Sequence, residues 1–189
     1  MNPESTAFGP WTYFTYPHTN GFCKDSSKLV IGKWQKNYTQ LWVYSRDGTP
    51  EQLVLETATP DRGFVYWDIA RETDELVTSI NNQLFVYDLK KGTPSYVWTP
   101  PNGARLGGLA SISTDGRRVT TAVENGDRNE VWLIERGAEA RPVLSVNHDW
   151  KIGHIHFCPA DENWIAFCHE GDPHMPDRMW AWHPEHAPP

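Results

Sequence analysis

Short apolar runs alternate with polar turns along most of the chain, and two of these patterns recur at a regular interval. The first is a turn with an acidic residue, followed by a short run rich in β-branched residues. Equivalent positions in its four copies are Val30, Val77, Val119 and Ile165, which are 47, 42 and 46 residues apart. A fixed interval of this size indicates a repeated structural unit.

The second pattern is an aliphatic residue followed by an aromatic one, and it comes after each copy of the first. Its four copies are Leu41-Trp42, Leu84-Phe85, Val131-Trp132 and Met179-Trp180, whose first residues are 43, 47 and 48 apart. A shared period of about 45 residues with about four strands per unit is typical of a β-propeller blade. One such sheet has two apolar faces, and stacking blades around an axis covers them.

We therefore predict an all-β fold, a β-propeller with about four blades that form a single partial domain over residues 1–189. The predicted blades are residues 17–56, 62–99, 106–146 and 152–183. The alternative for residues 72–87 is a helix, but the register of the repeat outweighs that weak local propensity.

The innermost strand of each blade is expected just before its acidic turn. These strands are predicted at Asn20–Cys23, Val65–Ile69, Leu109–Ile112 and Gly153–Phe157. Blade four lacks an outermost strand, because the chain continues only to Pro189 after Trp182. Either the segment Trp11–Tyr16 fills that position, or the chain is the first half of a larger propeller.

Composition supports the all-β interpretation and excludes several classes. The chain contains 10 tryptophans, 14 glycines and 15 prolines, a combination of aromatic strands and frequent turns. Its net charge of −7 argues against nucleic-acid binding. The mean hydropathy is −0.60, and no apolar run approaches the roughly 20 residues of a membrane span. The N-terminus has no signal-peptide pattern, and three cysteines cannot all pair, so we expect reduced thiols and a cytoplasmic location.

Histidines are concentrated late in the chain, where seven of the eight lie between residues 148 and 186. His154 and His156 flank Ile155 on a predicted inner strand, where alternation places both on one face. Such a pair can chelate zinc, manganese or copper. We favour the alternative that they line the channel or a blade interface, because no third ligand follows at a fixed spacing.

Two further candidates follow on the last blade. His169 precedes Glu170, so it is either an oriented base or a half-exposed loop residue. Arg178 lies near this cluster, and its guanidinium suits an anionic ligand such as a carboxylate. The alternative for Arg178 is an ordinary surface ion pair. Cys158 and Cys168 are expected to pack as small apolar residues.

Three segments of the last blade carry a family resemblance. They are Gly153–Pro159, Phe167–Gly171 and Asp177–Trp180, which together resemble the oligogalacturonate lyases. That family consists of cytoplasmic, seven-bladed propeller enzymes of pectin breakdown. The individual blades also resemble TolB-type repeats.

The resemblance implies β-elimination of an oligogalacturonide substrate, assisted by Mn²⁺. It assigns His154, His169 and Arg178 to binding of the uronate carboxylates at the channel wall. The family's metal ligands, a glutamine and three histidines, and its catalytic base have no match in this chain. We therefore expect them beyond Pro189, with this chain forming the N-terminal half of a seven-bladed enzyme and inactive alone.

Two expectations concern partners. An open half-propeller exposes two blade faces, which predicts self-association. The competing functional class is a non-enzymatic propeller of the TolB or WD40 kind that serves as a binding or scaffold module.

Overall fold

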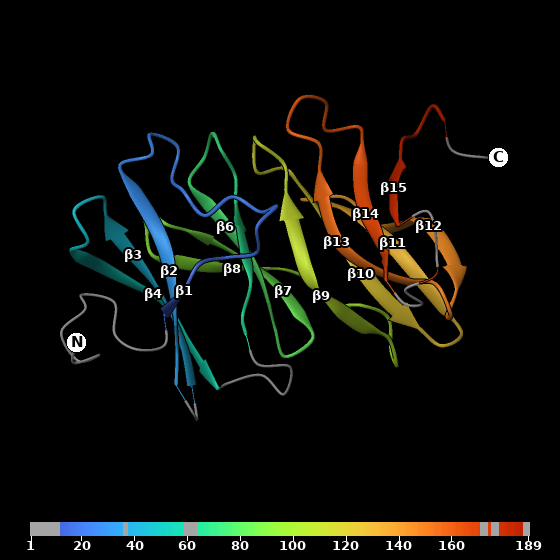
Figure 1. Ribbon diagram of the computed structural model, residues 1–189, viewed down its shortest axis with the longest axis horizontal. Helices are drawn as coiled ribbons and strands as arrows, with labels where there is room; N and C mark the ends of the chain where they lie inside the picture. The colour runs from blue at the N-terminus through green and yellow to red at the C-terminus, as the bar shows by residue number, and fades with distance from the viewer. Residues whose placement is uncertain (1–11, 36–37, 59–63, 171–173, 175–177, 187–189) are drawn as a thin grey trace.

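The chain folds into four antiparallel sheets, seen side by side in the computed structural model (Figure 1). The structure describes residues 12–35, 38–58, 64–170, 174 and 178–186, and it contains only strands, turns and loops within these ranges. The predicted all-β propeller fold is thereby confirmed, and residues 84–87 are in a strand rather than a helix. Among the described residues there is no helix of a length and hydropathy that could cross a membrane.

Each sheet is built from consecutive strands. Blade one contains β1 (Thr12–Tyr13), β2 (Lys28–Trp34), β3 (Tyr38–Ser45) and β4 (Pro50–Ala58). Blade two contains β5 (Trp67–Ile69), β6 (Glu75–Ile80), β7 (Gln83–Asp88) and β8 (Thr93–Trp98). Blade three contains β9 (Arg105–Ile112), β10 (Arg118–Asn125), β11 (Arg128–Glu135) and β12 (Arg141–Asn147). Blade four contains β13 (Lys151–Phe157), β14 (Ile165–Glu170) and β15 (Met179–Trp182).

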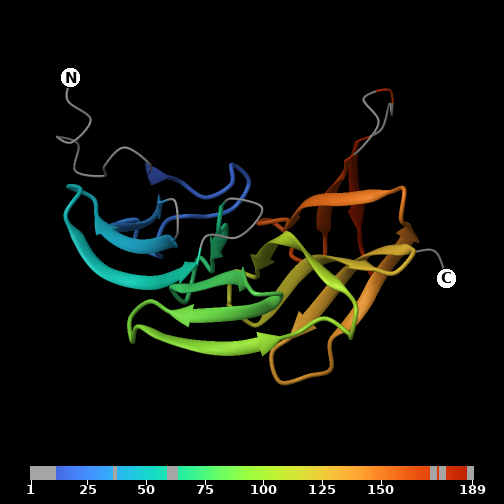
Figure 2. The same cartoon turned by 90° about the horizontal axis from the view of Figure 1, so that it is seen from below.

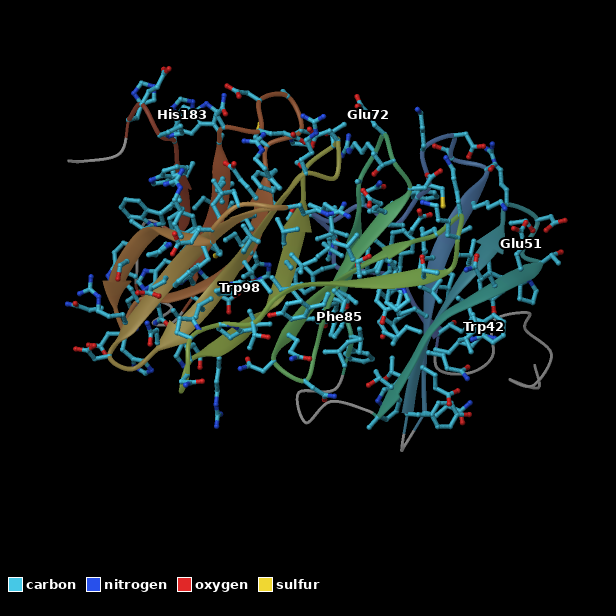
Figure 3. The ribbon with its side chains drawn as sticks, turned by 180° about the vertical axis from the view of Figure 1, so that it is seen from behind. Trp42, Glu51, Glu72, Phe85, Trp98 and His183 are labelled. Carbon is cyan, nitrogen blue, oxygen red and sulfur yellow. The ribbon has the colours of Figure 1, made fainter. Side chains whose placement is uncertain are left out.

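The four blades follow one another around an open arc, with blade one and blade four at its two ends (Figure 2). The innermost strand β9 of blade three contacts both β5 of blade two and β13 of blade four. The acidic turns lie at one end of the blades, where Glu72 and His183 are also found (Figure 3). The opposite end is formed by the first residues of β9 and β13.

The N-terminal strand belongs to blade one and not to blade four. Tyr13 pairs with Gly32 of β2, and the Tyr13 ring covers the space where Gly32 has no side chain. Within the described residues, the suggestion that Trp11–Tyr16 completes blade four is therefore wrong; Trp11 lies outside them. The predicted inner strand Asn20–Cys23 is reduced to one bridge between Phe22 and Leu29, because β1 occupies the other end of that edge of β2.

Three apolar clusters hold the four blades together, one at each junction. Leu41 of blade one and Phe85 of blade two lie in the first cluster. Leu84 of blade two and Trp132 of blade three lie in the second. The aliphatic residue of the repeated pair thus packs toward the next blade, and its aromatic neighbour packs toward the preceding one. This division follows from the alternation of side chains along a strand.

The two end blades present the same positions without a partner blade. Leu41, Leu84 and Val131 are fully buried, whereas the equivalent Met179 of blade four is 69% exposed. On blade one, the equivalent aromatic is Trp42, and the Lys33 ammonium lies 5.0 Å from the centre of its ring. The exposed face of blade four therefore carries the aliphatic position, and the exposed face of blade one carries the aromatic position. These are the two positions that pack together at the internal junctions.

We expect the exposed face of blade four to drive association of the chain. The variant Met179→Lys should shift the protein toward monomer, because a charge at this position opposes burial of the face. Tyr96→Lys is the matched control, since Tyr96 is 59% exposed on the outermost strand of blade two. Sedimentation velocity checks both variants. A wild-type chain that is monomeric at high concentration would contradict the prediction.

Asp68 braces three blades from the middle of the arc. Its Oδ1 atom accepts hydrogen bonds from the backbone N–H groups of Asn20 at 2.7 Å and Ile69 at 3.0 Å. Its Oδ2 atom accepts from the Ser111 hydroxyl at 2.7 Å and from the Ile112 N–H at 3.1 Å. Burial raises the pKa of Asp68, and the four donors oppose that rise. The carboxylate therefore joins blades one, two and three through polar contacts inside the core.

The variant Asp68→Asn should lower the free energy of unfolding by about 3 kcal/mol, because its amide directs N–H groups at groups that already donate. Urea denaturation measures the change. Asp47→Asn is the control, since Asp47 also accepts a backbone N–H, from Thr49 at 2.9 Å, but in an exposed turn. Equal losses from the two variants would show that Asp68 is not a brace.

Candidate functional site

A cavity of about 790 Å³ lies at the end of the blades opposite the acidic turns. Its wall comes from blades two, three and four, from the end of β4 in blade one and from the N-terminal segment. The polar and aromatic side chains of this wall include Tyr16, Tyr66, Glu124, Lys151, His154 and Glu170. A concave site with a few convergent polar groups is the usual form of a small-molecule site.

The segment from Phe14 to Asn20 carries the side chains of Tyr16 and His18 from blade one to blade four. Thr15 anchors it, because its hydroxyl contacts the backbone of Trp67 and lies 2.9 Å from the hydroxyl of Thr19. The ring of Tyr16 then packs edge-on against His154, with centroids 4.7 Å apart. Residues at opposite ends of the chain are thereby joined at the cavity wall.

His154 is positioned by an irregularity in β13. The register between β13 and β14 shifts between Gly153 and His156, and His154 has a φ of +51°. Such a left-handed residue in a bulge re-aims its side chain and is strained unless it is glycine. The Nε2 atom of His154 is bound to the carboxylate of Glu170 and lies 3.4 Å from the Tyr16 hydroxyl.

Two more imidazoles complete a histidine cluster, which we define as His18, His154 and His156. The His18 ring centre lies 4.8 Å from that of His156 and 5.4 Å from that of His154. The Nδ1 atom of His156 donates to the carbonyl oxygen of His154 at 3.0 Å. Burial, and then the neighbouring His156 and His154, lower the pKa of His18 to about 4. The cluster therefore holds a neutral His18 near neutral pH.

The other predicted site residues lie elsewhere. His169 is 4% exposed and stacks on Trp150 at 4.1 Å, at the junction of blades three and four. It faces away from Glu170, the next residue along the strand, so Glu170 pairs with His154 instead. Arg178 is exposed, and its carbonyl oxygen accepts the His169 N–H at 2.8 Å. The carboxylate-binding role of His154, His169 and Arg178 stays a prediction.

The sequence did not predict the place of Tyr16 and His18 in this site. It also did not predict the contact of Glu170 with His154. His18 stands out in the sequence as the one histidine before residue 148. Its partners, however, follow 136 and 138 residues later, and no local pattern indicates such a contact. The regular alternation assumed for His154 and His156 is also replaced by the bulge.

The histidine cluster does not have the geometry of a metal centre. Within the part of the chain that the structure describes, no three His, Cys, Asp or Glu side chains are arranged to hold a metal ion. Nitrogen atoms of His154 and His156 are engaged by Glu170 and by a carbonyl. The described residues therefore do not fit a manganese ion.

No protein-family model and no curated protein matches the chain in sequence. The fold nevertheless resembles solved propellers. An oligogalacturonate lyase in complex with manganese superposes with a TM-score of 0.76 at 18% identity, over 90% of this chain and 50% of the lyase. The oligogalacturonate lyase of Vibrio parahaemolyticus gives a TM-score of 0.76 at 16% identity, over 94% of this chain and 52% of the lyase.

A second kind of propeller is also similar. TolB from Acinetobacter baumannii gives a TM-score of 0.62 at 11% identity, over 86% of this chain and 39% of TolB. At these identities the likeness establishes the propeller fold. The chain spans about half the length of the lyases that it resembles.

The strain at His154 makes a testable pair of variants. His154→Ala and His154→Gly both remove the imidazole, but only glycine relieves the left-handed conformation. We expect the glycine variant to be more stable than the alanine variant by about 1 kcal/mol. Urea denaturation of both proteins measures the difference. Equal stabilities would contradict the strained conformation of residue 154.

Proposed function

We propose that the chain forms the substrate-binding half of a propeller that acts on oligogalacturonides by β-elimination. The observation that carries the proposal is the cavity wall with His154 held between Glu170 and Tyr16. The fold likeness to oligogalacturonate lyases supports it, because most of this chain superposes on about half of each lyase. The proposal comprises the oligogalacturonide substrate, the β-elimination activity and a cytoplasmic location.

The chemistry of the reaction explains the side chains that are required. A base removes the proton on the carbon next to the uronate carboxylate. The bond to the glycosidic oxygen then breaks, a carbon–carbon double bond forms, and the leaving oxygen gains a proton. Negative charge develops on the carboxylate during proton removal, so groups that bind this carboxylate lower the barrier.

The described residues can contribute binding and orientation to this reaction. Lys151 lines the cavity, and its positive charge attracts the carboxylates. The Glu170 carboxylate fixes the imidazole of His154, and the Tyr16 hydroxyl lies beside the same nitrogen. Tyr16, Phe64 and Tyr66 supply aromatic surface for the apolar faces of the sugars. In this proposal the base and the manganese ligands come from outside residues 1–189.

Arg178 enters the proposal as a carboxylate ligand at the edge of blade four, whereas His169 is buried against Trp150 and contacts Arg178 only through the backbone. Arg178 is exposed and adjoins His169 in the strand ladder, so it is free to reach a ligand from the side. Lysine should replace this arginine poorly, because an ammonium cannot form the bidentate pair with a carboxylate.

Calorimetric titration with trigalacturonate tests the proposal on the chain itself. We expect binding of trigalacturonate and none of the neutral galactose trimer, with affinity reduced about tenfold by His154→Gln. Arg178→Ala should weaken binding as well, and Arg178→Lys should restore little of it. Tyr96→Lys, far from the cavity, serves as the control.

Ultraviolet absorbance of the unsaturated uronate product provides a second readout. The chain alone should yield no product, with or without Mn²⁺. Metal-dependent turnover by residues 1–189 would show that the catalytic groups lie within them. Equal binding of the neutral trimer, or no binding of either sugar, would favour the competing non-enzymatic class, to which the TolB likeness points.

A further inference from the structure

The histidine cluster brings together three imidazoles with one carboxylate. His18 comes from the N-terminal segment, and His154 and His156 come from the inner strand of blade four. Within the described ranges, the carboxylate in contact with the cluster is that of Glu170, which is bound to His154. Imidazoles that lie about 5 Å apart repel one another once they are protonated, so the cluster is poorly compensated in the charged state.

One buried nitrogen of the cluster has no hydrogen-bond partner among the residues that the structure describes. The Nε2 atom of His18 is buried and lacks a hydrogen-bond partner among the described residues. By contrast, the Nε2 atom of His154 and the Nδ1 atom of His156 are both engaged. A buried polar nitrogen without a partner costs free energy unless a ligand or solvent satisfies it. His18 is therefore the member of the cluster that a ligand would complete.

We propose that His18, with His154 and His156, forms a carboxylate-binding subsite that takes up a proton when a uronate binds. This inference rests on the proposed function, since it names the residues that receive the substrate's charge. A carboxylate near His18 and His156 supplies the negative charge that the cluster lacks. It favours the imidazolium form, whose Nε2–H then donates to the carboxylate.

A carboxylate suits the cluster better than a neutral hydroxyl or a metal ion. A hydroxyl can bond to the neutral His18 but does not compensate a protonated cluster. A metal ion needs several converging ligand atoms, and the described residues do not provide them. His18 is neutral in the free protein because burial and the two neighbouring histidines lower its pKa to about 4. It can therefore take up a proton when a bound carboxylate compensates the positive charge.

The other groups around the cluster set the sign of the pH dependence. Tyr16 packs on His18 from the same segment, and Tyr66 of blade two packs edge-on against Tyr16. Glu170 faces the cluster from β14, and Lys151 and Glu124 line the adjoining cavity. A bound carboxylate favours the protonated form of His18, so its affinity should fall as the pH rises above the pKa of free His18.

Calorimetry in two buffers tests the proton uptake directly. Trigalacturonate is titrated near pH 6 in phosphate and in a buffer with a large ionisation enthalpy, and the difference in heat gives the protons bound. We expect the uptake of up to about one proton per bound ligand, and an affinity that falls by up to about tenfold for each unit of rising pH. His18→Gln should abolish the buffer dependence, because the amide can still bond but cannot titrate in this range.

Two controls keep the result interpretable. His148→Gln removes an exposed histidine outside the cluster and should leave the proton uptake unchanged. His156→Gln should reduce the uptake, and it replaces the first variant if circular dichroism shows that His18→Gln does not fold. Histidine resonances in NMR spectra, recorded with acetate in place of the sugar, report the same protonation without a substrate.

The outcomes separate this subsite from the proposed function. Trigalacturonate could bind without any proton exchange, and His18→Gln could leave that binding unaltered. This result overturns the subsite but leaves the proposed function standing. Protonation of His18 by acetate without any binding of trigalacturonate supports the subsite and overturns the proposed function. Zinc ions that displace trigalacturonate from the wild-type protein, but not from His18→Gln, would overturn the carboxylate assignment in favour of a metal site.

Discussion

The structure depends on the need to cover both faces of every blade. A strand directs alternate side chains to opposite faces, so the aliphatic residue of each repeated pair packs forward and the aromatic residue packs backward. The burial of Leu41, Leu84 and Val131 follows from this rule, and so does the exposure of Met179. Because each junction is filled by parts of two blades, no blade has a complete core of its own.

The site depends on departures from this regular packing. The bulge at His154 interrupts the ladder of blade four, and the segment that carries Tyr16 and His18 leaves the sheet of blade one. Both irregular parts meet at the wall of the cavity, where Tyr16 packs against His154. The regular strands thus provide a rigid frame. The candidate site residues lie in a bulge and in a loop, outside the regular strand pairing.

The blades could be predicted from the sequence because their cause is local and repeated. Two patterns with one period identified the strands around Val77 and Leu84, even where a helix was the local alternative. The site could be predicted only in part. His154 was found from its place on an inner strand, but His18 meets it across 136 residues, and one-residue alternation separates His169 from the cavity. Contacts between distant segments leave no periodic signal.

The crossing of the N-terminal segment also has a consequence for the order of folding. Contacts of Tyr16 and His18 with blade four join residues more than 130 positions apart, and such contacts close a very long loop. During synthesis the N-terminal blades emerge first, so the histidine cluster is complete only after the last inner strand has docked. Closure of the cavity wall is therefore a late event in the biogenesis of the chain. A partly made polypeptide carries blades but no binding site.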